Sequence, residues 1–339
     1  MFLVRTFLDR NDLSKHKSAL QDDSQTRILC IDGEGKISFL QDANHRLNWM
    51  SPSQTRLNIT CGVPLIEDGW QNPNFTMIYL GYSSDDGINY YALSLLLPRT
   101  GFLPGRHPSV FSLTKPGESA ILAQALSLSD WHRRYKFCSN CGQATKATEA
   151  GYKRVCSNIS SNASKSGGIP CNEASSNFNF PRTDPVVITL ILDRSERYAL
   201  LGRSSRHPPG TYSCIAGFME PGEGISDACK RESLEETGIT LSKTQLVLDQ
   251  PWPYPCSLML GCFSWTDFDV TENSTTSKPV LRDGELEDAK WFSLNDITDA
   301  FNGKNDILTL PPAYTIANRL IKAFLHNVKG KTKTNTNKE

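Results

Sequence analysis

Four glutamates lie close together in one stretch of this chain, where their carboxylates could hold metal ions. Glu223 follows a Pro-Gly pair, and Glu232, Glu235 and Glu236 come soon after it. Carboxylates crowded on so short a segment repel one another unless cations lie between them. Hard cations such as Mg²⁺ take oxygen ligands and commonly bridge carboxylates to substrate phosphates. The segment therefore indicates a metal site that cleaves a phosphate anhydride. A solvated acidic helix face is the common alternative.

A helix must position these carboxylates. Ser226 is a suitable N-cap residue and Gly238 a suitable residue just past a C-terminus, so we predict a helix between them. The three later glutamates stand at positions i, i+3 and i+4, and therefore project from one face of that helix. Arg231 is predicted to pair with an acidic neighbour and to hold its rotamer.

The whole stretch resembles the Nudix box, G-x5-E-x7-R-E-U-x-E-E-x-G-U, in which U is an apolar residue. Ser233 departs from the pattern, since the box has an aliphatic residue there. A helical serine can bond back to the carbonyl four residues earlier, here that of Cys229, and this change touches no carboxylate. Enzymes of this family hydrolyse a nucleoside diphosphate linked to another group. The matching residues are Gly217, Glu223, Arg231, Glu232, Glu235, Glu236, Gly238 and Ile239.

The segment from Asp249 to Met259 is similar to the S-Q-P-W-P-F-P-x-S signature of the NADH pyrophosphatase branch. Prolines alternating with aromatic residues make a stiff, extended loop. Trp252 and Tyr254 offer flat faces on which a nicotinamide or adenine ring can stack, and Ser257 can hydrogen-bond a ribose or phosphate oxygen. Asp249 and Tyr254 replace the usual serine and phenylalanine. A proline-rich connector with buried aromatics is the alternative.

Four cysteines upstream form a candidate zinc site. Cys138 and Cys141 make a C-x2-C knuckle, the spacing of a zinc half-site, and Cys156 and Cys171 complete a set of four. The 14 residues between Cys156 and Cys171 are rich in Ser, Asn and Gly, and we predict a flexible insertion there. Four thiolates leave no open position, so the zinc is structural. The resemblance implies a zinc ribbon at this place; four unrelated reduced cysteines are the alternative.

Further similarity to the branch flanks the ribbon. Trp131 to Arg134 (WHRR) precede the first knuckle, and we interpret His132 as structural rather than catalytic. Phe180 to Ile188 resembles the Y-P-R-x-D-P-x-x-I segment that leads into the Nudix sheet. Near the C-terminus, Glu285 to Phe292 (ELEDAKWF) resembles the E-x-x-E/D-A-x-W segment that begins a strand in this branch. The resemblance implies that Glu285 reaches a metal ion.

The composition bounds the class of protein. The chain has 339 residues, 38% of them hydrophobic, and a formal net charge of zero, which argues against a dominant attraction to nucleic acid or membranes. No apolar run is long enough to span a bilayer. Ten cysteines, four of them assigned to zinc, favour a reducing compartment, so we expect an intracellular, cytoplasmic protein. The peroxisome and the mitochondrion remain open alternatives.

The predicted fold class is α/β: a Nudix α/β/α sandwich with a mixed sheet, preceded by a zinc ribbon and an N-terminal α+β domain. We place the N-terminal, Nudix-like domain at 1–130, the ribbon at 131–180, the Nudix domain at 181–326 and a disordered tail at 327–339. Strands are expected at 76–82, 90–95, 186–192, 198–201 and 212–216, and helices at 118–128 and 312–325.

The resemblance implies hydrolysis of NADH or NAD⁺ to nicotinamide mononucleotide and AMP. It places two or three Mg²⁺ or Mn²⁺ ions on Glu232, Glu235, Glu236 and Glu285, with Glu236 orienting or deprotonating a water and Glu223 supporting the ligands. It also implies a homodimer, because relatives place the counterpart of Trp252 in the partner's pocket. The residues implied to line the dinucleotide pocket are Phe218, Trp252, Ser257, Met259, Ala317, Phe180 and Ile188.

Two other functions remain in competition. An NAD cap on RNA carries the same pyrophosphate, and some relatives remove it, although the neutral chain offers no clear basic groove for RNA. In a different class, the ribbon would be a docking module for nucleic acid or protein on an inactive Nudix scaffold. That hypothesis predicts missing glutamates, and none of the box glutamates is missing.

Overall fold

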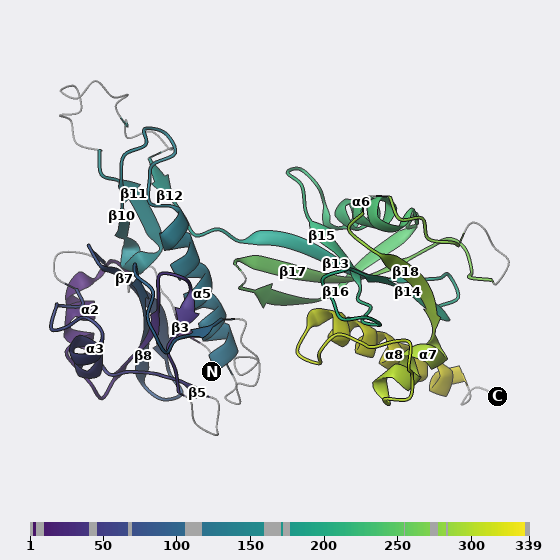
Figure 1. Cartoon of the computed structure of the whole chain (residues 1–339), viewed down its shortest axis with the longest axis horizontal. Helices are drawn as coiled ribbons and strands as arrows, with labels where there is room; N and C mark the ends of the chain where they lie inside the picture. Colours follow the sequence, from purple (N-terminus) through teal and green to yellow (C-terminus); the bar gives the residue numbers. More distant parts are fainter. Residues whose placement is uncertain are drawn as a thin grey trace. The chain divides into compact units, whose positions relative to one another are not determined.

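The computed structural model describes residues 3–4, 10–40, 46–66, 70–105, 117–158, 171, 177–253, 255–271, 277–282 and 284–335 (Figure 1). Its contacts divide the chain into two compact units. Unit 1 comprises Met1–Arg182 and Pro253–Cys256, and unit 2 comprises Thr183–Trp252 and Ser257–Glu339. Tyr254, most of the predicted cysteine-ribbon insertion and the last four residues lie outside the described residues.

Unit 1 is built on a sheet in the order β1-β7-β8-β2-β3-β9, with β6 paired to β7. Successive residues of the central strand β2 are buried on opposite faces, as the two-residue period of a strand requires. Leu29 packs with residues of α5 on one face, and Ile28 packs with Leu20 on the other. Figure 1 shows α5 on one side of this sheet and α2 and α3 on the other. The elements are β1 (Leu3–Val4), α2 (Leu13–Ala19), β2 (Thr26–Ile31), β3 (Lys36–Ile37), α3 (Pro52–Asn58), β6 (Gln71–Asn72), β7 (Phe75–Ser83), β8 (Ile88–Leu95), β9 (Leu103–Pro104) and α5 (Glu118–Arg134), together with a small pair formed by β4 (Phe39–Leu40) and β5 (Arg46–Leu47).

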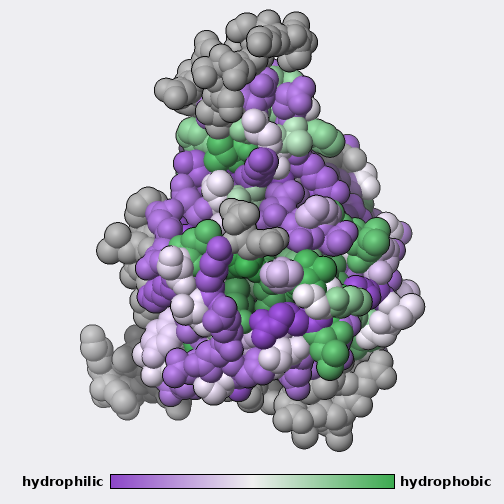
Figure 2. All heavy atoms as spheres, turned by 90° about the vertical axis from the view of Figure 1, so that its left-hand side faces the viewer, coloured by the Kyte–Doolittle hydropathy of each residue, from purple (hydrophilic) through white to green (hydrophobic). Residues whose placement is uncertain are grey.

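The cysteine ribbon adds a second, three-stranded sheet to unit 1. Its strands are β10 (Thr145–Thr148), β11 (Lys153–Cys156) and β12 (Phe178–Asn179), all antiparallel, and a short 3-10 turn at Glu149–Gly151 joins the first two. The turn packs closely on the N-terminal sheet, because a Cβ atom at Gly151 would lie 3.0 Å from the carbonyl oxygen of Met77. Figure 2 shows a face of unit 1 that is largely hydrophilic, with hydrophobic side chains gathered near its middle.

Unit 2 is a mixed sheet between helices, which confirms the predicted α/β class. The strand order is β16-β17-β13-β14-β18, with β15 paired to β13, and only the β13–β17 pair is parallel. Val187 and Ile191 of β13 pack on the side of α6, whereas Ile188 and Leu190 pack on the side of α8. The elements are β13 (Asp184–Leu192), β14 (Tyr198–Arg203), β15 (Ile215–Phe218), α6 (Ile225–Thr237), β16 (Lys243–Trp252), β17 (Ser257–Trp265), β18 (Asp288–Ser293), α7 (Leu294–Phe301) and α8 (Ile316–Asn335).

The expected elements are present, with shifted ends. The helix predicted at 118–128 continues to Arg134, and the strand predicted at 212–216 is β15, which starts only at Ile215. Helix α8 begins at Ile316, later than predicted, because the hydroxyl of Thr315 caps it by accepting from the amide of Asn318 at 3.3 Å. It continues to Asn335, through most of the tail that we predicted to be disordered.

Candidate functional site

The glutamate-rich helix is α6, and its boundaries correct one prediction. Its N-cap residue is Gly224, not Ser226, which is the second residue of the helix. The loop ahead of the helix turns at Gly222 with φ of +93°, a conformation that glycine adopts without strain, and so the helix starts earlier than expected. Gly238 ends the helix with φ of +71°, as predicted.

Strand β15 meets this helix at Gly217, the first residue of the box. A Cβ atom added at Gly217 would lie 2.0 Å from the carboxyl carbon of Glu232. Only glycine therefore lets the Glu232 carboxylate lie directly against the strand backbone. The sequence pattern identifies Gly217, and the structure gives the physical reason for it.

Arg231 gathers three of the four box glutamates around one guanidinium. Its Nε and Nη2 atoms donate to the two carboxylate oxygens of Glu223 at 2.6 and 2.9 Å. Its Nη1 atom donates to Glu232 at 2.7 Å and to Glu235 at 3.0 Å. A further bond runs from Nη2 to the carbonyl of Phe218 at 2.8 Å, so the arginine ties the loop, the helix and β15 together.

The electrostatics of Glu223 and Arg231 follow from this pairing. The hydrogen bonds from Arg231 are the largest influence on Glu223 and lower its pKa to about 2. The same bonds raise the pKa of Arg231 above its ordinary value. The pair is therefore fully charged at neutral pH, and it holds the loop on the helix.

The three helical glutamates lie in different surroundings, although they project toward one face. Glu236 is 4% exposed, whereas the side chain of Glu235 is 53% exposed. Burial is the largest influence on Glu232 and raises its pKa, while Arg231 opposes the change. The carboxylates of Glu235 and Glu285 also raise the pKa of Glu232, so Glu285 is close enough to interact with the site.

Ser233 does not make the bond that we predicted. Its hydroxyl donates to the carbonyl of Ile239 at 2.8 Å rather than to the carbonyl of Cys229. The side chain is fully buried where the box has an aliphatic residue. The chain reverses at Gly238 and so brings the Ile239 carbonyl over the last helical turn, where this serine satisfies it.

Four of the residues expected to line a dinucleotide pocket come together on neighbouring strands. Phe218 of β15 and Met259 of β17 both pair with Val186, one on each side of β13. Ser257 pairs with Asp184 of β13 and with Trp252 across the β16–β17 hairpin. Phe218 is 60% exposed, so its ring is available on this surface.

The remaining predicted pocket residues lie elsewhere. Ile188 and Ala317 are 5% and 4% exposed and belong to the core between the sheet and α8. Phe180 belongs to unit 1, where it packs edge-on against Phe178 with ring centroids 5.3 Å apart. Sequence reasoning missed Gly261, where a Cβ atom would lie 2.9 Å from both the Cδ1 atom of Ile316 in α8 and the carbonyl oxygen of Leu248.

The four ribbon cysteines converge, as predicted. They form the single compact set of metal-ligand atoms found in the described part of the chain, with all four sulfurs within 4.8 Å of one another. Neighbouring sulfurs are 3.4 to 3.5 Å apart. A disulfide needs about 2.05 Å, whereas a tetrahedron with Zn–S bonds of about 2.3 Å needs about 3.8 Å. The donor set therefore fits a structural zinc. It consists of Cys138, Cys141, Cys156 and Cys171.

Backbone amides favour one thiolate in this set. Burial raises the pKa of Cys138, but hydrogen bonds from the amides of Cys141 and Asn140 outweigh it and lower the pKa to about 7. Burial raises the pKa of Cys156 instead. A C-x2-C turn that directs amides at its first sulfur is well suited to a thiolate bound to metal.

Two parts of the chain, which include the glutamate cluster and the cysteine ribbon, match models of known domains. Residues 182–310 match the NUDIX domain, and residues 133–161 match the NADH pyrophosphatase zinc ribbon domain. Residues 182–310 are therefore similar to a NUDIX domain, and residues 133–161 to the zinc ribbon of NADH pyrophosphatases. The ribbon match ends before Cys171, so the convergence of this fourth cysteine is a finding of the structure.

Several curated proteins are similar to this chain. NAD-capped RNA hydrolase NUDT12 of Homo sapiens is 40% identical over 228 residues, which cover 66% of this chain and 45% of that protein. NAD-capped RNA hydrolase of Schizosaccharomyces pombe is 40% identical, over 62% of this chain and 55% of that protein. NAD(P)H pyrophosphatase NUDT13, mitochondrial, of Mus musculus is 35% identical, over 61% and 55%. The matched region spans about half the length of these relatives.

Among the helices in the described residues, none is both long enough and apolar enough to cross a bilayer.

Proposed function

We propose that this protein hydrolyses the pyrophosphate of NADH and NAD⁺ to nicotinamide mononucleotide and AMP, with divalent cations bound. The main support is the arrangement at α6, where Gly217, Arg231 and the box glutamates form one connected cluster next to β15. The names of the similar proteins, which refer to NAD(P)H and to NAD-capped RNA, support the same substrate class.

The carboxylates suit Mg²⁺ or Mn²⁺. Glu232, Glu235, Glu236 and Glu285 offer hard oxygen donors. Burial and the neighbouring carboxylates raise the pKa of Glu232, so a cation at this place relieves an unfavourable charge. Bound divalent cations supply charge neutralisation at the phosphate oxygens and lower the pKa of a water.

The other residues have distinct proposed roles. Glu236 orients or deprotonates the attacking water, and its burial restricts its rotamers. Arg231 is a positioning residue, since it holds Glu232 and Glu235 through direct bonds. Glu223 acts through Arg231, which it binds with both carboxylate oxygens.

The dinucleotide is proposed to lie over the exposed surface beside β13. Phe218 and Trp252 stack on its rings, Ser257 bonds a ribose or phosphate oxygen, and Met259 contacts the substrate between them. Ile188 and Ala317 support this surface from the core. We propose that the stacking Trp252 comes from the second subunit of a homodimer, for which a dimeric mass by light scattering is the test.

One panel experiment tests the activity. The purified protein is incubated with NADH, NAD⁺ and NADPH in the presence of Mg²⁺ or Mn²⁺, and the products are identified by mass. Nicotinamide mononucleotide and AMP are expected from NADH. Glu236→Gln keeps the shape of the side chain and should lower kcat about 10²–10⁴-fold. Intact dinucleotides with either metal, in a protein shown to be folded, would rule the proposal out.

Removal of NAD caps from RNA is a second candidate function of the same site. The similarity to two proteins named NAD-capped RNA hydrolase favours it specifically. Release of nicotinamide mononucleotide from NAD-capped RNA, compared with turnover of free NADH at matched concentration, distinguishes the two functions. We also propose a reducing intracellular compartment, because none of the ten cysteines forms a disulfide.

A further inference from the structure

A buried arginine of the cysteine ribbon lacks an acidic partner in the described part of the chain. Arg154 of β11 is 2% exposed. Its Nε donates to the hydroxyl of Thr145 at 2.7 Å, and its Nη2 donates to the carbonyl of Thr145 at 2.8 Å and to Oε1 of Gln71 at 3.3 Å. Its Nη1 donates to Nδ1 of His132 at 2.8 Å. These bonds occupy four of the five N–H groups of the guanidinium.

His132 does not compensate the charge of Arg154. Burial, and then the charge of Arg154, lowers the pKa of His132 to about 3, so the imidazole is neutral. Because Nδ1 accepts from Arg154, the ring proton is on Nε2, which lies 2.8 Å from the carbonyl of Gly151. Every acceptor around Arg154 is therefore uncharged, and its positive charge is left buried without a counter-charge.

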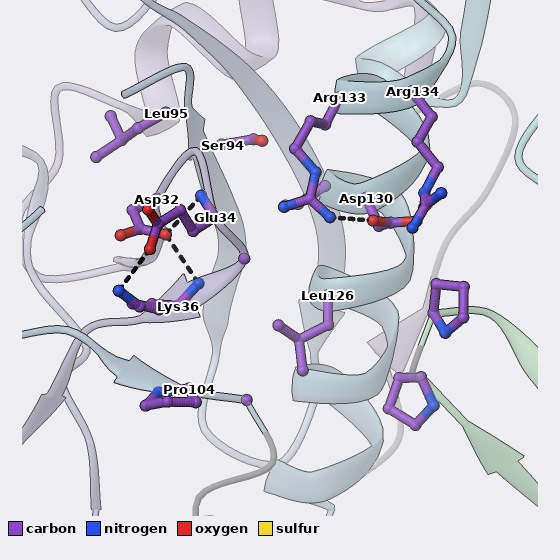
Figure 3. Close-up of a pocket in the computed structure, with 15 residues that line it drawn as sticks. Asp32, Glu34, Lys36, Ser94, Leu95, Pro104, Leu126, Asp130, Arg133 and Arg134 are labelled. Carbon is purple, nitrogen blue, oxygen red and sulfur yellow. Dashed lines mark hydrogen bonds and ion pairs between the residues drawn. The ribbon is translucent and has the colours of Figure 1, made fainter. Parts of the chain in front are cut away.

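Arg154 lines a pocket of about 240 Å³ inside unit 1. The pocket lies where the ribbon meets the N-terminal sheet, and Gln71, Ser94 and Leu95 form part of its wall. Lys136 and Arg133 line it as well, and none of its lining residues is acidic, although Arg133 pairs with Asp130 of the same helix. Figure 3 shows the neighbouring pocket, with Arg133 reaching from α5 toward Ser94 and Leu95, which line both pockets.

The neighbouring pocket provides a contrast, because its charges are balanced. Lys36 pairs with Glu34 at 2.5 Å, and Arg134 pairs with Asp130 at 2.6 Å (Figure 3). Asp32 lines it as well and accepts from backbone amides. The lining of the Arg154 pocket, in contrast, includes no carboxylate, and of its three cations only Arg133 pairs with an acidic residue in the described part of the chain.

We propose that the Arg154 pocket binds the phosphate group of a small ligand, either inorganic phosphate or a phosphate monoester. The guanidinium of Arg154 and the ammonium group of Lys136 are donors that phosphate oxygens prefer. The bound anion supplies the counter-charge that the described residues do not give to Arg154. A volume of about 240 Å³ holds a phosphate with a small substituent, but it is small for a complete dinucleotide.

The test is titration calorimetry on the zinc-loaded full chain. Inorganic phosphate and AMP are added separately, with adenosine as the uncharged control. Divalent cations are left out, so that the glutamate cluster does not contribute phosphate binding. We expect phosphate or AMP to bind and adenosine not to bind, and the tighter of the two identifies the ligand. Affinity should fall as salt rises.

Two lysines of the ribbon make a matched pair of variants. Lys136 lines the pocket and Lys146 does not, and both are exposed. Lys136→Ala should weaken phosphate binding about fivefold, and Lys146→Ala should leave it unchanged. Arg154→Gln should abolish binding, with zinc content and circular dichroism as checks on folding. If the wild-type protein binds neither ligand, or if both lysine variants lose affinity equally, the proposal is overturned.

Discussion

Substitution of Gly217 gives the sharpest test of how the glutamate cluster is positioned. In Gly217→Ala, the new Cβ atom would stand 2.0 Å from the carboxylate of Glu232. To reach an ordinary contact of 3.4 Å, that carboxylate must move about 1.4 Å. The movement is large enough to break the 2.7 Å hydrogen bond between Glu232 and Arg231.

The displacement should reduce activity more than stability. A misplacement of about 1 Å in a catalytic arrangement can cost about 10²-fold in rate. We therefore expect kcat/KM for NADH to fall about 100-fold. Overpacking by one methyl group typically costs about 1–3 kcal/mol, so the protein should remain folded. Initial rates with saturating Mg²⁺ and a urea unfolding curve measure the two effects.

Gly224 supplies the matched control, because it belongs to the same segment and has room for a methyl group. Its φ is −86°, which any residue adopts, and the nearest atom to an added Cβ would be an oxygen of Asp227 at 3.6 Å. Gly224→Ala should therefore retain most of the kcat/KM of the wild-type protein. Equal kcat/KM values for Gly217→Ala and Gly224→Ala would refute the argument that Glu232 must lie against β15.

Two further predictions concern the ion pair and the zinc. The folded pKa of Glu223 is about 2, below the ordinary 4.5, so its pairing with Arg231 stabilises the protein above about pH 4.5 and is lost as the pH falls toward 2. Glu223→Gln should reduce the loss of stability across that window, measured by urea midpoints; an unchanged pH dependence would contradict the pairing. Removal of zinc by a chelator should abolish hydrogen-exchange protection of β10 and β11 but leave that of β13 intact. Retained protection in β10 and β11 would show that the ribbon does not depend on the metal.

Much of the candidate site could be predicted from the sequence because its parts are local. Arg231 and three of the glutamates lie on a single helix, where helical spacing makes Arg231 and Glu235 neighbours, and Glu223 lies in the loop directly before that helix. The four cysteines were also predictable, since their chemistry restricts them to few arrangements. Local sequence patterns predicted the wrong hydrogen-bond partner where a group from outside the helix lay within reach. Ser233, for example, bonds to the Ile239 carbonyl that the chain reversal brings near.

Burial was harder to predict than residue identity. Ile188 and Ala317 were expected in the pocket, yet both are core residues, because whether α8 exposes or covers a position depends on how it packs on the sheet. Gly261 permits that close packing, and nothing in its local sequence indicates that Ile316 approaches it. The two-residue period of a strand therefore predicts which face of the sheet a residue lies on. It does not predict whether a helix distant in the sequence covers that face.

The surroundings of Arg154 illustrate the same limit in the ribbon. In the sequence it is one basic residue in a short strand, and nothing near it indicates burial. Its acceptors come from three other segments, at Gln71, His132 and Thr145, and only the folded unit assembles them. A guanidinium so well held by neutral groups is fixed in place before any anion arrives. This preorganisation is what a selective phosphate site requires, since little ordering remains to be done when the ligand binds.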